Sequence, residues 1–231
     1  MIDGFNFTVD VIRTNRVRSV SIYLEGEIVK MRVPKSLSEK RIREFITKRT
    51  PWIKTKLKEV SERPLVKSKE YVSGEMLSYL GRTYRLKVTH GNETSIKLKG
   101  RFFSATVLKA DKTAQETIRS MLISWYRQHA EIGLSKKTEY LAEIIGVQPN
   151  SITVKDYKSR WGSCSNRGDI TYNWKVILAP QPIIDYVVVH ELCHMLEPNH
   201  SSRYWKHVER YASDWRDCRN WLKTNSHSMC I

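Results

Sequence analysis

The sequence is poor in cysteine and has no long hydrophobic run, and both absences narrow the class of protein. Its four cysteines, Cys164, Cys193, Cys218 and Cys230, lack the paired spacing of a zinc knuckle. Without a secretory signal, scattered cysteines are more typical of free thiols than of disulfides. No apolar run approaches the roughly 20 residues that cross a bilayer, and no signal-peptide core with a cleavage site is present. We therefore expect a cytoplasmic protein without a membrane span.

Internal repeats, low-complexity tracts and an obvious flexible linker are also absent. The chain has 231 residues, 40% of them hydrophobic, so it is long enough to bury a substantial core. Short alternating segments dominate residues 1–110, and apolar residues at helical spacing dominate residues 111–231. The sequence predicts an α+β protein with a β-rich N-terminal region, 1–110, and a helical C-terminal region, 111–231, either distinct or joined in one compact domain.

Positive charge is concentrated in the first of these regions. Residues 1–110 hold 24 basic and 11 acidic residues, a net charge of +13, whereas residues 111–231 hold 16 and 13, a net charge of +3. A basic region of this kind suits an anionic partner such as nucleotide phosphates, nucleic acid or an acidic protein. A basic surface that only keeps the protein soluble is the alternative, because no recognised nucleic-acid motif accompanies the charge.

Local patterns predict the main elements. Residues 17–33 alternate around a Glu25-Gly26 turn, as in a β-hairpin. A capping box that begins at Ser36 opens an amphipathic helix, which Pro51 interrupts and restarts as a helical pair. A second capping box at Thr113 opens one long scaffold helix, or two with a break near Gly133. Strands are expected at 151–154 and 170–177, and an extended peptide could pair with a strand edge beside the next motif.

The H-E-L-C-H run at residues 190–194 is the main chemical signal. On a helix, His190 and His194 leave the same face one turn apart and can meet one metal ion. Glu191 lies beside them, where its carboxylate can reach a metal-bound water as general base. Pro198 ends the helix, so the chain can turn back and present His200 as a third ligand. Three protein ligands with one open position are typical of a catalytic zinc site.

Residues beyond the motif are candidates for supporting roles. Tyr204 lies one turn from His200, and His207 lies two turns on. Either side chain could lie behind the metal ligands or donate a hydrogen bond to an oxyanion. A packed or exposed side chain without such a role is the alternative for both.

Further runs accompany the metal motif: K-S-R-W-G-S-C-S at 158–165, Asn173, Ala179-Pro180 and Asn199-His200-Ser201 with Tyr204-Trp205. Together with H-E-L-C-H they resemble the YgjP-like metallopeptidase domain family, and matches such as Pro51-Trp52-Ile53 and Tyr79-Leu80-Gly81-Arg82 extend the resemblance to most of the chain. The family is related to the SprT and WLM zincins. The resemblance implies a zincin-type α+β catalytic region, with His190, His194 and His200 as zinc ligands and Glu191 as catalytic base. Tyr204 stands where family members commonly have Phe.

Three functions remain open from the sequence. The first is a zinc metallopeptidase with one Zn²⁺ per chain, Glu191 as base, and a peptide or protein substrate. The second is a metal-dependent nucleoside triphosphate pyrophosphohydrolase of the UTP type, an activity also attributed within this family, with Lys158 and Arg160 on the phosphates. Trp161 and Asn173 are further candidate substrate-binding residues. The third is a nucleic-acid-binding module that keeps zinc for stability and does not need Glu191.

Overall fold

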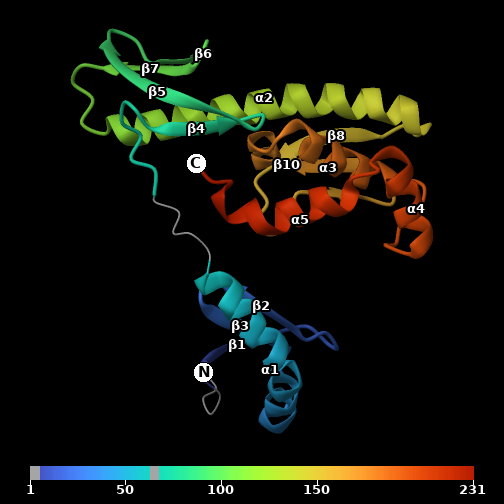
Figure 1. The fold of residues 1–231 in the computed structure, drawn as a ribbon. Coiled ribbons are helices and arrows are strands. Elements are labelled where there is room, and N and C mark those ends of the chain that lie inside the picture. The colour runs from blue at the N-terminus through green and yellow to red at the C-terminus, as the bar shows by residue number, and fades with distance from the viewer. Residues whose placement is uncertain (1–5, 63–67) are drawn as a thin grey trace. The chain divides into compact units, whose positions relative to one another are not determined.

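The computed structural model describes residues 6–62 and 68–231, which belong to two compact units, Met1–Leu65 and Val66–Ile231 (Figure 1). Each unit combines helices with small sheets, so the predicted α+β class is confirmed. The division lies near residue 65, not at the expected boundary of 110 and 111, because the strands between residues 76 and 108 pack on a helix of the second unit. The basic excess of residues 1–110 is therefore shared between both units.

The first unit is a three-stranded sheet with one helix. Its elements are β1 (Val9–Thr14), β2 (Ser21–Glu25), β3 (Ile28–Pro34) and α1 (Glu39–Ser61). The strand order is β1-β3-β2, with β3 parallel to β1 and antiparallel to β2. Alternate residues of the strands and one face of α1 are apolar, and they bury a small core of Val9, Val29, Met31, Val33, Ile42, Ile46 and Ile53.

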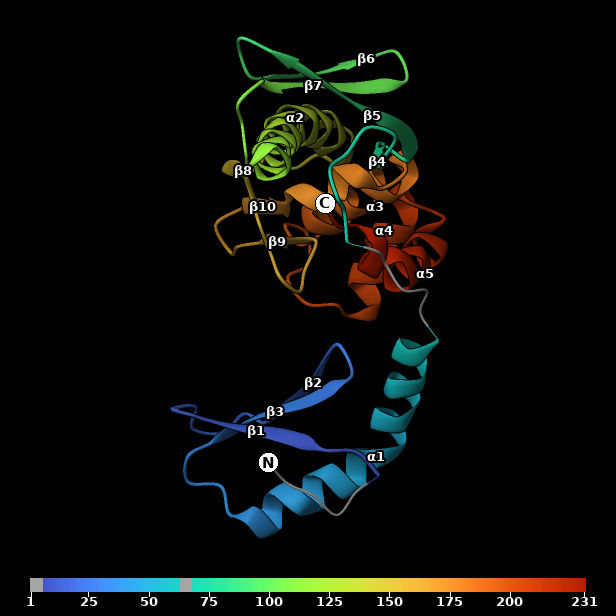
Figure 2. The same ribbon diagram turned by 90° about the vertical axis from the view of Figure 1, so that its left-hand side faces the viewer.

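Helix α1 differs from the helical pair that the sequence predicts. It runs unbroken through Pro51 and is visibly bent (Figure 2), as expected when proline removes one backbone donor inside a helix. The N-cap is Ser38, whose side chain accepts from the Arg41 amide at 3.5 Å, and not Ser36. The apolar face buried against the sheet holds the two halves together.

The second unit begins with a four-stranded sheet and a long helix. Its first elements are β4 (Met76–Tyr79), β5 (Arg82–Gly91), β6 (Ser95–Lys99), β7 (Phe102–Leu108) and α2 (Ala114–Ile145), and the strand order is β4-β5-β7-β6. Helix α2 continues through Gly133 without a break. Thr113 makes no side-chain cap, since its amide and hydroxyl both donate to Asp111.

A smaller sheet and the remaining helices complete this unit. They are β8 (Ser151–Lys155), β9 (Gly162–Cys164), β10 (Asp169–Asn173), the 3-10 helices η1 (Trp174–Leu178) and η2 (Ser226–Ser228), α3 (Gln181–Cys193), α4 (Ser202–Tyr211) and α5 (Trp215–Asn225). The strand order is β8-β10-β9, so β9 is an edge strand. The strand predicted at 170–177 ends at Asn173, because that side chain caps η1 by accepting from the Lys175 amide at 3.2 Å.

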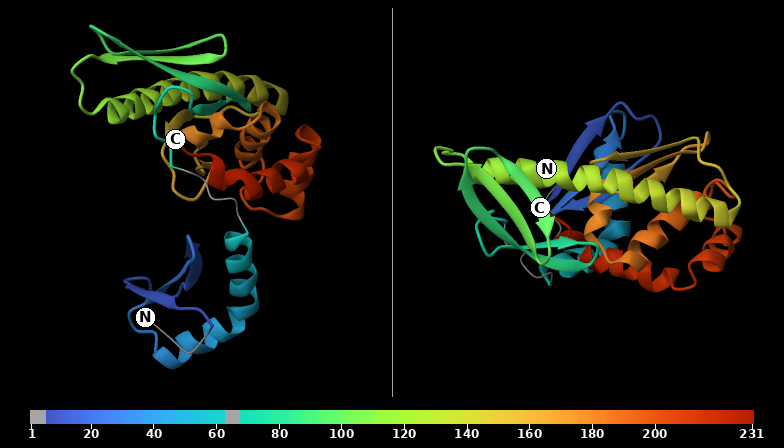
Figure 3. Two further views of the ribbon diagram at one scale, coloured as in Figure 1. Left: turned by 60° about the vertical axis from the view of Figure 1, so that its left-hand side comes forward. Right: turned by 90° about the horizontal axis from the view of Figure 1, so that it is seen from above.

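Helix α2 is the central layer of the second unit. It packs on β6 and β7 along one side and on α3, η1 and β8 along the other (Figures 2 and 3). Buried side chains recur along its whole length, from Ile118 to Ile145. One large core therefore joins the four-stranded sheet to the small sheet and to α3.

The turn between β4 and β5 fixes the start of α3. The Leu80 amide donates to the Ile177 carbonyl at 2.8 Å. Gly81 has a φ of +73°, and a Cβ added there would lie 2.7 Å from the Pro180 Cα. Only glycine allows this approach, so the turn holds the residue that caps α3. In the described part of the chain, no helix combines the length and apolar character needed to cross a bilayer.

Candidate metal centre

The apolar character of α3 places the first histidine of the motif. Nearly every residue from Ile183 to Val189 is buried, so the helix is packed on several sides. The helix ends at Cys193, and His194 is its C-cap in αR geometry, so its ring still projects near that of His190. After the chain reverses, Ser201 caps α4 by accepting from the Tyr204 amide at 3.2 Å, which sets His200 just before that helix.

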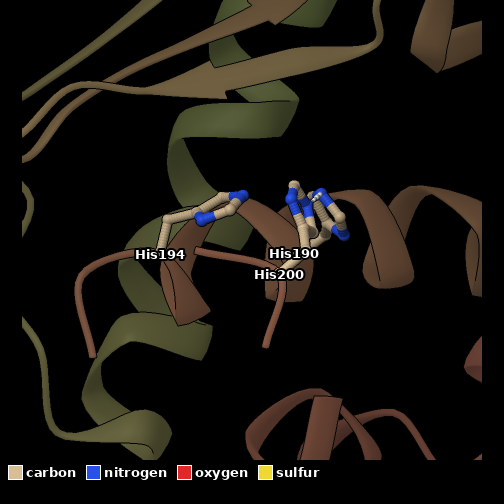
Figure 4. Close-up of side chains that lie close together, drawn as sticks. All are labelled: His190, His194 and His200. Atoms are coloured by element: carbon tan, nitrogen blue, oxygen red, sulfur yellow. Dashed lines mark hydrogen bonds between the residues drawn. The ribbon is translucent and has the colours of Figure 1, made fainter. Parts of the chain in front are cut away.

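The structure brings together the three histidines that the sequence predicts (Figure 4). One ring nitrogen of each of His190, His194 and His200 lies within 4.8 Å of the other two, and the Nε2 atoms of His190 and His200 are 3.1 Å apart. Burial, followed by the neighbouring histidines, lowers the pKa of His190 to about 3. Burial also lowers the pKa of His194 and that of His200. Three neutral imidazoles whose ring nitrogens lie this close together fit a divalent metal.

Glu191 is the buried carboxylate of the site. Its residue is only 5% exposed, and burial raises its pKa to about 8, with Arg160 opposing the shift. A buried carboxyl beside a cluster of histidines is typical of a general base or acid, since its pKa lies near neutral pH. A cation held by the histidines would favour the ionised form.

Gly162 on β9 is a site residue that sequence reasoning did not single out, although it lies in the W-G-S-C run. A Cβ added to Gly162 would lie 2.5 Å from Glu191 Oε1 and 2.7 Å from Glu191 Cγ. Glycine therefore lets the edge strand pass directly over the carboxylate. In the sequence, the W-G-S-C run indicated only a family resemblance. The tertiary structure gives a steric reason for its glycine.

A cleft of about 350 Å³ opens beside Glu191 and His190. Its lining includes Trp161 and Gly162 from the start of β9, and Tyr186 and Val187 from α3. Three cationic side chains also line it: Arg160, Arg219 and Lys223. A second hollow lies at the other end of β9, where residues 165–168 face His194, Met195 and Pro198. His190 thus borders the first hollow and His194 borders the second.

The two residues predicted behind the ligands have different positions. Tyr204 is fully buried, and its hydroxyl donates to the His190 backbone carbonyl at 2.9 Å. Its ring centroid lies 4.6 Å from that of His194 and 4.7 Å from that of His200. Tyr204 therefore supports all three ligands, and its hydroxyl is already engaged. His207 is partly buried, and no hydrogen bond or ring contact among the described residues joins it to the cluster.

The four candidate substrate-binding residues also separate. Arg160 and Trp161 line the cleft, whereas Lys158 is exposed and lines none of the described hollows. Asn173 is 3% exposed, and its amide donates to the carbonyls of Tyr157 at 2.9 Å and Arg160 at 3.2 Å. Asn173 thus holds the segment that carries Arg160 and is not open to a substrate.

Comparison with known proteins identifies the family of the chain. The family model for the YgjP-like metallopeptidase domain matches residues 18–225. The chain is therefore a member of that family, and it is a metal-dependent hydrolase. The predicted family is confirmed over nearly the whole chain, including the first unit.

Two solved structures show local similarity to the chain. The metallopeptidase zymogen abylysin of Pyrococcus abyssi is 25% identical, and the match covers 39% of this chain and 93% of that chain with a TM-score of 0.34. The metallopeptidase zymogen jannalysin of Methanocaldococcus jannaschii is 17% identical, and the match covers 39% and 95% with a TM-score of 0.35. No curated protein matches the sequence.

Proposed function

We propose that this protein is a zinc-dependent peptidase in which His190, His194 and His200 hold the metal and Glu191 is the general base. The observation that supports it is the convergence of three neutral imidazoles beside one buried carboxylate. Three protein ligands leave a coordination position open, as in catalytic zinc sites. When bound, zinc supplies a Lewis acid that lowers the pKa of water and polarises a carbonyl.

Proton transfer in this proposal is the work of Glu191. Its carboxylate accepts a proton from water while the water oxygen attacks the scissile carbonyl carbon. The same carboxyl then delivers a proton to the amine nitrogen as the C–N bond breaks. One water is consumed, and one new carboxylate and one new amine are released. Gly162 keeps the carboxylate in place, because β9 closes the space above it.

The metal ligands need support so that their rings keep one orientation. Tyr204 supplies it for His190 through the hydrogen bond to that residue's carbonyl, and for His194 and His200 through ring contact. Ligands held in this way are preorganised, which raises metal affinity. An oxyanion role for His207 stays a prediction.

The edge strand β9 is the proposed substrate-binding element. Its outer edge is not paired with another strand of the described sheet, and its start and end lie beside the two hollows. A peptide in extended conformation can add to such an edge by backbone hydrogen bonds while its side chains enter the hollows. The scissile bond would then lie over the histidines, between the two hollows.

Pyrophosphohydrolase activity is the second candidate, and the three cationic residues of the cleft favour it. Arg160, Arg219 and Lys223 could hold phosphate oxygens beside the same site. The family comparison gives no support to a nucleotide or nucleic-acid partner. A nucleic-acid-binding role and a cytoplasmic location stay predictions.

The test is a product screen by mass spectrometry. Zinc-loaded wild-type protein and Glu191→Gln protein are incubated with one mixture of peptides and nucleoside triphosphates. We expect new peptide termini from the wild type, and a rate lower by roughly 10²–10⁴-fold in Glu191→Gln, the usual contribution of a general base. Zinc content is measured for both proteins, so that a lost base is distinguished from a lost metal.

Two outcomes would contradict the peptidase. Monophosphate and pyrophosphate produced only by the wild type would establish the second candidate. Unchanged products from Glu191→Gln would show that the carboxylate is not the base, since the substitution preserves side-chain size and removes the charge.

A further inference from the structure

The cleft beside Glu191 has an uneven distribution of charge. Arg160, Arg219 and Lys223 contribute three cationic groups, and Glu191 is the one carboxylate among its lining residues in the described structure. Arg219 and Lys223 are four residues apart on α5 and therefore lie on one face of that helix. Arg160 approaches from the segment before β9. The cleft is thus cationic on both of its walls, with apolar residues between them.

Arg219 is held close to the metal ligands. Its Cζ lies 5.2 Å from the centroid of the Trp205 ring, and that ring lies 5.6 Å from the centroid of His200. Trp205 is in turn stacked on Trp215 at 4.2 Å. A guanidinium fixed on an aromatic ring loses less entropy when it binds an anion.

Neither Arg160 nor Arg219 forms a salt bridge in the described part of the chain, although the charge of Arg160 acts on Glu191. The salt bridges of the second unit involve other cations, such as Lys137 with Asp185 and Arg216 with Glu209. A surface arginine without a salt bridge is common, but two such arginines that line the same cleft indicate a candidate binding site for an anion. A cleft lined by three cationic side chains and a single carboxylate, Glu191, has an excess of positive charge and is complementary to an anionic group.

The position of the cleft sets which part of a substrate would meet these cations. Trp161 and Gly162 line it at the start of β9, and residues 165–168 line the second hollow at the end of β9. Antiparallel pairing is the more stable kind per residue. A peptide antiparallel to β9 would place the residues after the scissile bond in the cationic cleft.

Resting on the proposed peptidase function, we infer that the cleft formed by Arg160, Arg219 and Lys223 selects substrates with a carboxylate just after the scissile bond. That carboxylate is either an acidic side chain or the C-terminal carboxylate of a short peptide, because both present the same planar pair of oxygens. Arg219 is the principal specificity-determining residue, since it lies at the edge of the metal cluster. Arg160 is less suitable for mutation because it also acts on Glu191.

The experiment uses the full-length zinc-loaded protein and a set of matched peptides. The residue after the scissile bond is Asp, Asn or Lys, and each peptide is made with a free and with an amidated C-terminus. We expect kcat/KM for Asp to exceed that for isosteric Asn by about 10-fold to 100-fold, the usual range for a hydrogen bond to a charged group. The preference should weaken at high salt. If the advantage follows the free C-terminus and not the side chain, the chain end is the source of the carboxylate.

Variants separate specificity from folding. Arg219→Gln should remove the preference for Asp, and Arg219→Glu should reverse it in favour of Lys. The ratio of two substrates is read within each variant, so a general loss of activity does not affect it. Lys136→Glu is the matched control, because Lys136 is exposed on α2, lines none of the described hollows and carries the same charge. It should keep the wild-type ratio.

The results distinguish failure of this inference from failure of the proposed function. Equal rates for Asp and Asn peptides, or a preference that Arg219→Glu leaves unchanged, would overturn the inference while cleavage itself preserves the peptidase. Preference for a carboxylate before the scissile bond would overturn it as well. Hydrolysis of nucleoside triphosphates with no peptide cleaved would overturn both.

Discussion

Both compact units pack β-sheet against α-helix, with one sheet and one helix in the first and two sheets and several helices in the second. Among the described residues, only the second unit has buried polar or charged side chains. In the first unit the buried core consists of seven aliphatic or methionine side chains. In the second, the described buried residues include Thr138, Asn173 and Glu191, and the half-buried His190 and His194 lie beside Glu191. Burial of an ionisable group costs free energy unless something compensates it, so the difference supports the proposal that the second unit carries the reaction.

Thr138 and Asn173 show how ordinary buried polar groups are satisfied. Thr138 donates to the Leu134 carbonyl at 2.7 Å, its hydroxyl oxygen lies within hydrogen-bond distance of the Tyr172 hydroxyl at 3.0 Å, and Asn173 donates to two backbone carbonyls. The buried His190 Nδ1 has no such partner. In a folded protein most buried polar atoms are paired, and an exception beside three converging imidazoles is typical of a functional site.

The largest change in stability is expected from a substitution in the apolar core of the first unit. This substitution tests whether that unit folds independently of the metal site. Ile46 is fully buried in this core, and Ile46→Ala should reduce the free energy of unfolding of that unit by about 2–5 kcal/mol through transfer and cavity terms. Hydrogen exchange of α1 amides measures it, and zinc titration should give the wild-type affinity. Lys48→Ala, exposed on the same helix, is the control. A loss of zinc affinity in Ile46→Ala would show that the two units are coupled.

Metal removal should destabilise the second unit and leave the stability of the first unit unchanged. At free zinc about 100 times the Kd, binding stabilises the folded state by about 2.7 kcal/mol, and a chelator removes that stabilisation. Amides of α3 and α4 should lose protection from hydrogen exchange, whereas those of α1 should not. The Glu191→Gln variant should still be stabilised by zinc to the same extent, since Glu191 is not a proposed ligand. Equal loss of protection in both units would contradict the assignment of the metal to the second unit.

Gly162→Ala tests the close approach of β9 to the base. The new methyl would lie 2.5 Å from Glu191 Oε1, so the carboxylate or the strand must move. A displacement of about 1 Å can cost roughly 100-fold in rate, and we expect a reduction of that size in kcat/KM with zinc content unchanged. Gly133→Ala is the control, because its Cβ would meet only Ile177 Cδ1 at 3.9 Å. Full activity of Gly162→Ala would mean that Glu191 is free to shift.

The smallest expected effect concerns Tyr204. Tyr204→Phe keeps the ring under the three histidines and removes only the hydrogen bond to the His190 carbonyl, at a cost of about 0.5–1.5 kcal/mol in stability. Thermal unfolding with zinc measures it, and peptide turnover should change little. A loss of turnover as large as that of Glu191→Gln would instead assign the hydroxyl to the oxyanion.

Local patterns in the sequence predicted much of this structure. The spacing of His190, His194 and His200 required little tertiary information, because a helix turn and a Pro-induced reversal bring nearby residues together. Strand alternation and helical periodicity likewise predicted most elements, including the long scaffold helix. Two predictions were wrong where local signals compete. Pro51 bends α1 without ending it, so the predicted helical pair is one helix. The predicted strand 170–177 ends at Asn173, because that side chain caps the following helix.

Long-range contacts decided the rest. The sequence by itself determined the cluster of three histidines, the nearby carboxylate and the family, since these depend on residues close together in the chain. Only the tertiary structure placed the four-stranded sheet with the second unit, brought Gly162 over Glu191 from about 30 residues away, and collected Arg160, Arg219 and Lys223 around one cleft. Composition records that such residues exist, but which of them meet depends on packing between elements distant in sequence, and no local propensity encodes that.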